Sequence, residues 1–334
     1  MGIDQLIGNN RIKNILHSYL RNDNIPYSML FAGAAAANTI GFAKAFAKAI
    51  QCQEKDDDFC GACRHCEEID KEIFPDIKII TPEGQFYKKE QIIFLKEDNY
   101  RRPMTGKKKI FIIKDAQKMN ENSANAFLKV LEEPAESTMF ILLTKNLNNL
   151  LPTIKSRCQI LNFTLPTPEE LKAFFLTKGI EESQAELLSY LGQSGLEEVV
   201  DGNYDDLMQK RDRSLDILVK LSNKTNVDEI LLDLNTRSRS RDKFLDYFTE
   251  LVNLLSLLLR DIMLLHIEEE SGYIINIDYK ETLMNLRQQL PVAKVLYLIH
   301  RMELLFRDIH RNLNTKVLIL EFIKSYTLKE VNHV

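Results

Sequence analysis

Four of the five cysteines lie within one short segment of the 334-residue chain. Cys52, Cys60, Cys63 and Cys66 follow the spacing C-x7-C-x2-C-x2-C. Thiolates held on tight turns can complete a tetrahedral zinc site, and four protein ligands leave no position open for a reacting water. Clustered thiols in a reducing compartment are more often metal ligands than disulfide partners. The spacing therefore predicts a structural Zn²⁺ site with these four ligands, and the alternative is four free thiols.

Two other residues bear on this site. His65 lies between the last two cysteines of the cluster, but if it were a ligand one cysteine would have no role, so an all-thiolate site is the simpler interpretation. Cys158 is remote from the cluster and follows Arg157. We interpret Cys158 as a small buried residue.

A second candidate site follows the apolar run 28–32, which is typical of a core strand. Phosphate-binding loops have the pattern GxxxxGK[ST], in which backbone N–H groups and the lysine bind phosphate and the hydroxyl binds magnesium. Gly33 matches the first glycine of this pattern. The positions of the second glycine, the lysine and the hydroxyl residue hold Asn38, Thr39 and Ile40. Tight ATP binding is therefore not expected, whether the loop is degenerate or was never a phosphate loop.

The run Ile110–Asp115 points the same way. It is typical of a strand that ends in an acid, like the strand that positions magnesium in an ATPase. The next residue is Ala116, where an ATPase would place a glutamate to activate water. Together with the missing lysine and hydroxyl, this residue predicts that the chain does not hydrolyse ATP.

A polar residue and an arginine mark the next strand and the segment after it. Thr144 ends an apolar strand, and a short helix that follows leads to Ser156 and Arg157. Taken alone, Arg157 reads as a surface arginine, because exposed arginines are the common case.

The elements that position these residues alternate between apolar runs and amphipathic helices through the first half of the chain. Buried strands that alternate with helices predict a parallel sheet covered on both faces. The expected strands span 28–32, 76–81, 109–114, 138–144 and 159–163, and the expected helices include 11–20, 40–52 and 122–133.

The pattern changes after Leu165. Thr167 can cap a helix that begins at Pro168, and from there to the end of the chain the pattern is helical, with almost no strand signal. We expect an α/β plus all-α protein. Its predicted domains are an α/β domain over 1–165 that carries the four-cysteine module (52–66), a small helical domain over 166–207 and a helical bundle over 208–334.

Composition excludes several classes of protein. The chain has 44 Lys+Arg against 48 Asp+Glu, a formal net charge of −4, so nonspecific attraction to nucleic acid cannot dominate its binding. The compact basic clusters, Arg101-Arg102 and Lys107–Lys109, read as solvated loops. The most apolar segment, 251–267, contains Arg260 and Asp261 and reads as a buried helix, so no membrane association is expected. No secretory signal is visible at the N-terminus, which favours a cytoplasmic protein.

Several motifs resemble one known family. The segment 122–134, NSANAFLKVLEEP, is similar to the N-x-x-A-N-A-L-L-K-x-L-E-E-P helix of the AAA+ clamp-loader subunits of bacterial DNA polymerase III. The run Leu151–Cys158, the cysteine insert after the first core helix, Phe74-Pro75-Asp76 and the C-terminal helix from Asn312 fit the same family. The resemblance covers essentially the whole chain and is to the delta-prime type of subunit.

This resemblance implies a fold and a role. The first domain would be an AAA+ domain with a RecA-like sheet, the second its helical lid, and the third part of a collar that joins the subunits. Ser156 and Arg157 would form an arginine-finger motif, with Arg157 reaching the γ-phosphate bound by a neighbouring subunit. Thr144 would stand at the sensor position with a vestigial role. Glu197 would stand near the usual sensing arginine of the lid, and an acid there fits an inactive site.

The implied partners follow from the same family. The chain would be a non-catalytic subunit of the polymerase holoenzyme, in a hetero-pentamer with the gamma/tau motor subunits and a delta subunit, and would act on the sliding clamp and primed DNA through that complex. Structural zinc would be its cofactor, without bound ATP. The alternatives are an active AAA+ motor ATPase with an unusual phosphate loop and a zinc-dependent DNA-binding protein that acts alone.

Overall fold

The computed structural model describes most of the chain, in two compact units. The described residues are 2–34, 37–84, 86–193, 204–238, 241–269, 273–310 and 313–327. The first unit comprises Met1–Val200 and the second Asp201–Val334. The predicted three-domain division, with boundaries after 165 and 207, stays a prediction.

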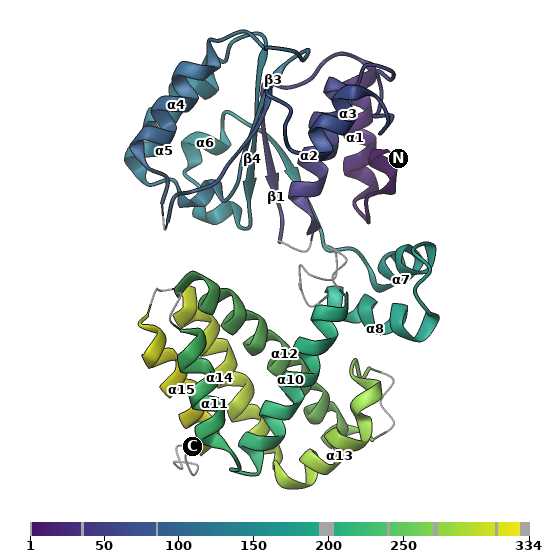
Figure 1. The fold of residues 1–334 in the computed structure, drawn as a ribbon, viewed down its shortest axis with the longest axis vertical. Helices are drawn as coiled ribbons and strands as arrows, with labels where there is room; N and C mark the ends of the chain where they lie inside the picture. The colour runs from purple at the N-terminus through teal and green to yellow at the C-terminus, as the bar shows by residue number, and fades with distance from the viewer. Residues whose placement is uncertain are drawn as a thin grey trace. The chain divides into compact units, whose positions relative to one another are not determined.

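A parallel sheet forms the centre of the first unit (Figure 1). Its strands are β1 (Ser28–Ala32), β2 (Ile77–Ile80), β3 (Lys109–Ile113), β4 (Thr138–Thr144) and β5 (Gln159–Asn162), in the order β2-β3-β4-β1-β5. Every residue of β1, β3 and β4 is buried, which explains why these strands are continuous apolar runs and not alternating ones. The register pairs Ala32 with Thr144, so that β1 and β4 end side by side.

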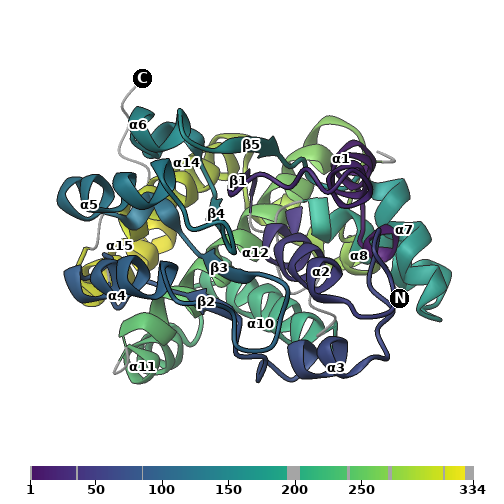
Figure 2. The same cartoon turned by 90° about the horizontal axis from the view of Figure 1, so that it is seen from above.

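Helices cover both faces of this sheet (Figure 2). One face carries α1 (Asn10–Arg21), α2 (Thr39–Gln51) and α3 (Arg64–Asp70), and the other carries α4 (Lys89–Asn99), α5 (Glu121–Glu132) and α6 (Pro152–Lys155). Short 3₁₀ turns span Ile3–Gln5, Ala116–Lys118 and Leu147–Asn149. Each face has its own apolar core, and the predicted fold class, a covered parallel sheet followed by helices, is confirmed.

The start of the helical region is fixed by a capping box. The Thr167 hydroxyl accepts a hydrogen bond from the Glu170 backbone N–H at 3.2 Å, and the Glu170 carboxylate accepts one from the Thr167 N–H at 2.9 Å. These bonds begin α7 (Pro168–Thr177), which is followed by α8 (Glu182–Gln193). The cap predicted at Thr167 is confirmed. Glu197, which the resemblance places near the sensing position of the lid, lies outside the described residues.

Helices and short connecting turns make up the described part of the second unit. It comprises α10 (Tyr204–Ser222), α11 (Val227–Arg237), α12 (Arg241–Ile267), the 3₁₀ turn Ile277–Tyr279, α13 (Lys280–Gln289), α14 (Val292–His310) and α15 (Thr315–Thr327). Leu255 and Leu258 on α12 and Met302 on α14 are almost fully buried in this unit's own core. Among the described helices, none is long and apolar enough to cross a membrane.

Candidate functional site

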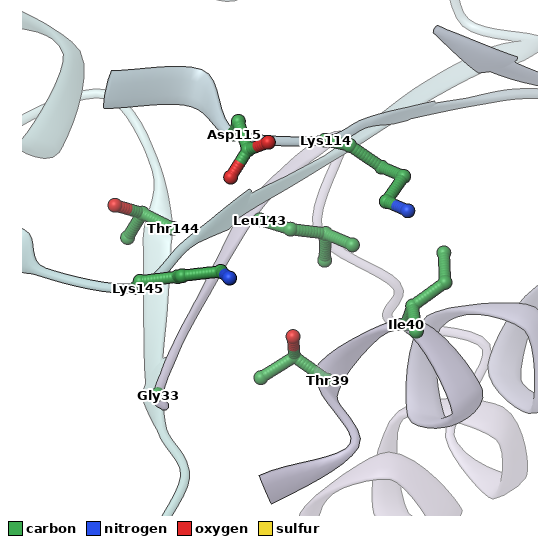
Figure 3. Close-up of a pocket in the computed structure, with 8 residues that line it drawn as sticks. All are labelled: Gly33, Thr39, Ile40, Lys114, Asp115, Leu143, Thr144 and Lys145. Carbon is green, nitrogen blue, oxygen red and sulfur yellow. The ribbon is translucent and has the colours of Figure 1, made fainter. Parts of the chain in front are cut away.

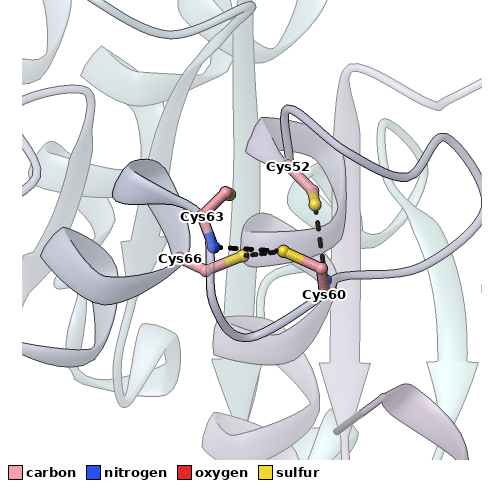
Figure 4. Close-up of side chains that lie close together, drawn as sticks. All are labelled: Cys52, Cys60, Cys63 and Cys66. Atoms are coloured by element: carbon pink, nitrogen blue, oxygen red, sulfur yellow. Dashed lines mark hydrogen bonds between the residues drawn. The ribbon is translucent and has the colours of Figure 1, made fainter.

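The four predicted ligands come together beside α2 and α3 (Figure 4). Cys52 is the residue that ends α2, Cys63 precedes the first turn of α3, Cys66 lies within α3, and Cys60 lies in the loop between the two helices. Their sulfur atoms all lie within 4.8 Å of one another. Cys60 Sγ and Cys66 Sγ are 3.9 Å apart. Sulfur atoms about 2.3 Å from a tetrahedral metal lie about 3.8 Å from each other, so the cluster fits a structural metal such as zinc.

Backbone N–H groups point at the sulfurs of this cluster. Cys60 Sγ accepts hydrogen bonds from the N–H groups of Ala62 at 3.4 Å and Cys63 at 3.2 Å, and Cys52 Sγ accepts one from the Cys60 N–H at 3.4 Å. The bonds from Ala62 and then Cys63 lower the pKa of the Cys60 thiol to about 6. Burial raises the pKa of the Cys66 thiol to about 12, so a bound cation would be needed to hold both residues as thiolates.

His65 makes other contacts, in line with its exclusion as a ligand. Its Nδ1 lies 2.9 Å from the Gln51 carbonyl oxygen, and its Nε2 lies 3.2 Å from the side-chain nitrogen of Gln53. The ring packs against Phe74, with 4.9 Å between ring centroids. His65 therefore supports the loop around the cluster, and the four thiols remain the complete donor set.

A pocket lies at the carboxyl ends of β1, β3 and β4 (Figure 3). It is lined by Gly33, Thr39, Ile40, Lys114, Asp115, Leu143, Thr144 and Lys145. This is where the phosphate-loop comparison places a nucleotide. The pocket therefore retains the position of a nucleotide site, and its lining can be compared with what phosphate and magnesium require.

The loop that follows β1 is closed by one of its own side chains. Asn38 has a left-handed backbone with φ of 54°, and its side-chain oxygen accepts a hydrogen bond from the Gly41 N–H at 3.0 Å. That N–H belongs to the first turn of α2, where a phosphate loop would present such groups to its ligand. A Cβ atom at Gly33 would lie 2.8 Å from the Phe163 side chain, so this position requires glycine for packing alone. Ala35 and Ala36 lie outside the described residues.

Three further residues of the lining do not supply the missing magnesium ligand or a group that activates water. Ile40 offers an apolar side chain where magnesium requires a hydroxyl. The Asp115 carboxylate accepts hydrogen bonds from Gln117 at 3.1 Å and from Lys118 at 3.2 Å. Thr144 donates to the Asn146 carbonyl oxygen at 3.1 Å and so caps its own turn.

Two lysines of this pocket were not singled out from the sequence. Lys114 precedes Asp115, Lys145 follows Thr144, and Figure 3 shows both amino groups directed into the space between the strand ends and α2. Their positions next to strand ends were the available signal. Nothing in the sequence distinguished them from lysines that face solvent.

Arg157 follows α6 and contacts the C-terminal end of α5. Its Nε donates to Glu132 Oε1 at 2.7 Å, and its Nη2 donates to the same oxygen. Its Nη1 donates to the Thr153 carbonyl oxygen at 2.9 Å and to the Ser156 hydroxyl at 3.3 Å. The side chain is 31% exposed. Two segments singled out from the sequence, 122–134 and 151–158, are thus joined by this ion pair.

Cys158 packs against the core on the same face of the sheet as α5. It is partly buried, and burial raises the pKa of its thiol to about 12. A thiol in this environment is neutral and unreactive at physiological pH, as its interpretation as a packing residue predicts.

Comparison with known proteins identifies relatives. A family model described as DNA polymerase III, delta subunit, matches residues 8–167, which include the sheet, the pocket, the cysteine cluster and Arg157. The delta' subunit of DNA polymerase III from Bacillus subtilis is 27% identical over 284 residues, 83% of this chain and 83% of the relative. The gamma/tau subunit from Mycoplasma pneumoniae is 32% identical over 153 residues, 46% of this chain and 22% of the relative.

One solved structure was compared over nearly the whole chain. A gamma subunit-related protein of Thermotoga maritima covers 95% of this chain and 97% of its own, at 19% identity and a TM-score of 0.46. The similarity to the Bacillus subtilis delta' subunit extends over most of both sequences, whereas that to gamma/tau covers less than half of this chain. With the motifs of 122–134 and 151–158 inside the matched segment, the chain is similar to the delta' subunits of DNA polymerase III.

Proposed function

We propose that this chain is a clamp-loader subunit that does not hydrolyse ATP and that supplies Arg157 to the ATP site of a neighbouring subunit. The observation that carries the proposal is a pocket without the groups for nucleotide hydrolysis, in a chain that also presents a partly exposed arginine. A chain with both properties completes another active site more readily than its own.

The residues that line the pocket argue against ATP hydrolysis in it. The N–H of Gly41 is engaged by Asn38, so an incoming phosphate would have to displace that side chain. Ile40 stands where a magnesium ligand is needed. Ala116 begins a 3₁₀ turn and is 1% exposed, so no side chain at this position can activate a water. An active motor ATPase, the alternative function, would need other residues to bind the phosphate, coordinate magnesium and activate water.

Arg157 has the chemistry that phosphoryl transfer requires in trans. A guanidinium neutralises the charge that develops on the transferred phosphoryl group and bonds its oxygens with two parallel N–H groups. Arginines supplied in this way change rates by roughly 10³–10⁵-fold. The partners would be gamma/tau motor subunits and a delta subunit, and the sliding clamp and primed DNA would be met through the assembled complex.

Zinc would be held by Cys52, Cys60, Cys63 and Cys66. A site with four thiolates supplies folding stability and no open coordination position, so we assign it a structural role. His65 and the N–H groups of Ala62 and Cys63 would orient the loop around it.

The test is the ATPase rate of the reconstituted loader, stimulated by clamp and primed DNA. We expect Arg157→Ala to lower the stimulated rate by at least roughly 100-fold. Arg157→Lys should recover little of it, since an ammonium lacks the two-pronged geometry. Lys155→Ala, two residues away on α6, is the matched control and should retain the rate. Gel filtration must show that each variant still assembles.

Two outcomes would overturn the proposal. An unchanged rate with Arg157→Ala in an intact complex would leave Arg157 a structural residue. Hydrolysis by the isolated chain, abolished by Asp115→Asn, would favour the motor ATPase instead.

A further inference from the structure

The contacts of Arg157 occupy all of its guanidinium nitrogens. Nε and Nη2 donate to Glu132 Oε1, and Nη1 donates to the Thr153 carbonyl and the Ser156 hydroxyl. The edge formed by Nε and Nη2 is one of the two edges of a guanidinium that can bind an oxyanion with two parallel bonds. In this arrangement the positive charge is already paired with a carboxylate, and Arg157 cannot give that edge to a phosphate.

We infer that Glu132 restrains Arg157 in a resting position, from which the arginine is released only when a neighbouring nucleotide site engages it. This inference rests on the proposed function of Arg157. Glu132 is therefore a positioning residue whose carboxylate competes with the phosphate for the same guanidinium. The restraint would keep the neighbouring site slow until clamp and DNA bring the two subunits into the productive arrangement.

The position of Glu132 supports a role beyond the stability of α5. It is the last residue of that helix, and Glu133 follows it directly. Acidic side chains at a helix C-terminus are unfavourable because the carbonyl end of the helix is already negative. The Glu132 carboxylate therefore destabilises the end of α5, and its ion pair with Arg157 offsets this effect.

The exposure of the pair makes the restraint reversible. The Glu132 side chain is 46% exposed and that of Arg157 is 31% exposed. Exposed ion pairs are weak because water and salt screen them. A triphosphate with several negative charges attracts the guanidinium more strongly than one carboxylate does. The pair can therefore hold Arg157 in the resting state and still yield to a bound nucleotide.

Glu133 provides a matched control. It has the same charge, lies at the same helix end and is exposed. In the described part of the chain, Arg157 forms its ion pair with Glu132. Glu133→Gln removes one negative charge from this surface without removing the partner of Arg157, and it separates the restraint from a general change in surface charge.

The experiment compares reconstituted loaders that contain wild-type chain, Glu132→Gln, Glu133→Gln, Arg157→Ala, or Glu132→Gln combined with Arg157→Ala. The ATPase kcat and KM are measured without and with clamp and primed DNA. We expect Glu132→Gln to raise the unstimulated kcat by roughly two- to fivefold, the worth of an exposed ion pair, with an unchanged KM. The fully stimulated rate should stay within about twofold of wild type, because the pair is already broken in that state.

The other variants separate the possible failures. Glu133→Gln should match wild type, and the double variant should be as slow as Arg157→Ala, because a restraint has no effect without the residue it restrains. If Arg157→Ala is slow while Glu132→Gln matches wild type or lowers both rates, the restraint is wrong and the proposed function stands. If Arg157→Ala itself is unchanged, the proposed function fails and the restraint fails with it. Equal acceleration by Glu133→Gln would assign the effect to surface charge and would also overturn the restraint.

Discussion

Single residues decide what each site can do. The same N–H groups that make a helix N-terminus attractive to phosphate can be satisfied by a side chain, and Asn38 does so for Gly41. Ile40 cannot serve a metal, whereas the thiols of the cysteine cluster can. The residue type at a fixed position thus decides which ligand a site can hold.

The cysteine cluster gives a prediction at this scale. In metal-free protein the Cys60 thiol, with a pKa of about 6, is mostly thiolate at pH 7, whereas burial holds Cys66 and Cys158 near 12. Because the thiolate is the nucleophile, iodoacetamide should alkylate Cys60 well before these two, with a rate that rises through pH 6 and then levels. Mass spectrometry of quenched samples measures the order of labelling.

Two controls make this prediction specific. Cys60→Ser should remove the fast labelling, and Zn²⁺ added before the reagent should suppress it in the wild-type chain. A labelling midpoint near pH 8.5, the ordinary value for cysteine, would show that the N–H groups of Ala62 and Cys63 do not stabilise the thiolate.

At this scale the sequence was informative where spacing is local. The four ligands lie within 52–66, and the capping box spans Thr167 to Glu170, so both could be predicted from adjacent residues. The pairing of Glu132 with Arg157 joins residues 25 positions apart through the packing of α5 against α6, and no local pattern contains it. The same holds for Lys114 and Lys145, which line one pocket only because β3 and β4 are neighbours in the sheet.

Elements are held in register by a buried group of charges at one end of the sheet. Asp98 near the end of α4 lies 2.8 Å from Lys78 Nζ on β2 and 3.2 Å from Lys109 Nζ on β3. The side chains of Asp98 and Lys109 are only 4% and 5% exposed. One carboxylate therefore fixes a helix to two neighbouring strands, and Lys109, which the sequence grouped with a solvated basic loop, is an internal residue.

This group predicts a pH-dependent loss of stability. Burial raises the pKa of Asp98, but hydrogen bonds from Lys78 and Lys109 outweigh it and lower the pKa below its usual value. The charged form is favoured in the folded state, so its contribution is present above the unfolded pKa and is lost as pH falls through the folded one. Asp98→Asn should lower the free energy of unfolding by roughly 3 kcal/mol at pH 7, because Lys109 loses its buried partner.

Urea unfolding at several pH values measures this effect. The difference between Asp98→Asn and wild type should shrink as pH falls below 4, where the wild-type carboxyl also becomes neutral. Glu97→Gln, at the adjacent exposed position, is the control and should match wild type at every pH. A difference that stays constant down to pH 3 would mean that packing, and not charge, is what the substitution removes.

The order of the elements along the chain was more predictable than the order of the strands in the sheet. Apolar runs bounded by charged or turn residues placed all five strands to within a residue or two. Strand alternation cannot show, however, that β1 lies between β4 and β5, because that order depends on which helices cross which face. The family resemblance, and not the periodicity, implied the arrangement of the sheet.

The whole molecule contains separate apolar cores. Residues of the second unit form one core of their own, whereas the sheet of the first unit has a core on each face. Cys52 and Cys66 belong to the core between the sheet and α2, together with Phe59 of the intervening loop. A metal bound by the cluster would therefore stabilise the first unit directly and the second unit only as far as the two unfold together.

Calorimetry tests this division in the zinc-loaded chain. Two units that share no apolar core predict two unfolding transitions. Chelation of the metal should lower the midpoint of one transition by roughly 5–15 °C, because the binding free energy of a structural metal is part of the folding free energy of its unit. Cys158→Ser, which changes a thiol outside the cluster, should show the same response as wild type, whereas Cys63→Ser should show the lower midpoint before any chelator is added.

A chelator that shifts both transitions equally, or neither, would contradict a metal confined to the first unit. Loss of all loader ATPase with unchanged midpoints would show instead that the metal acts in catalysis and not in folding.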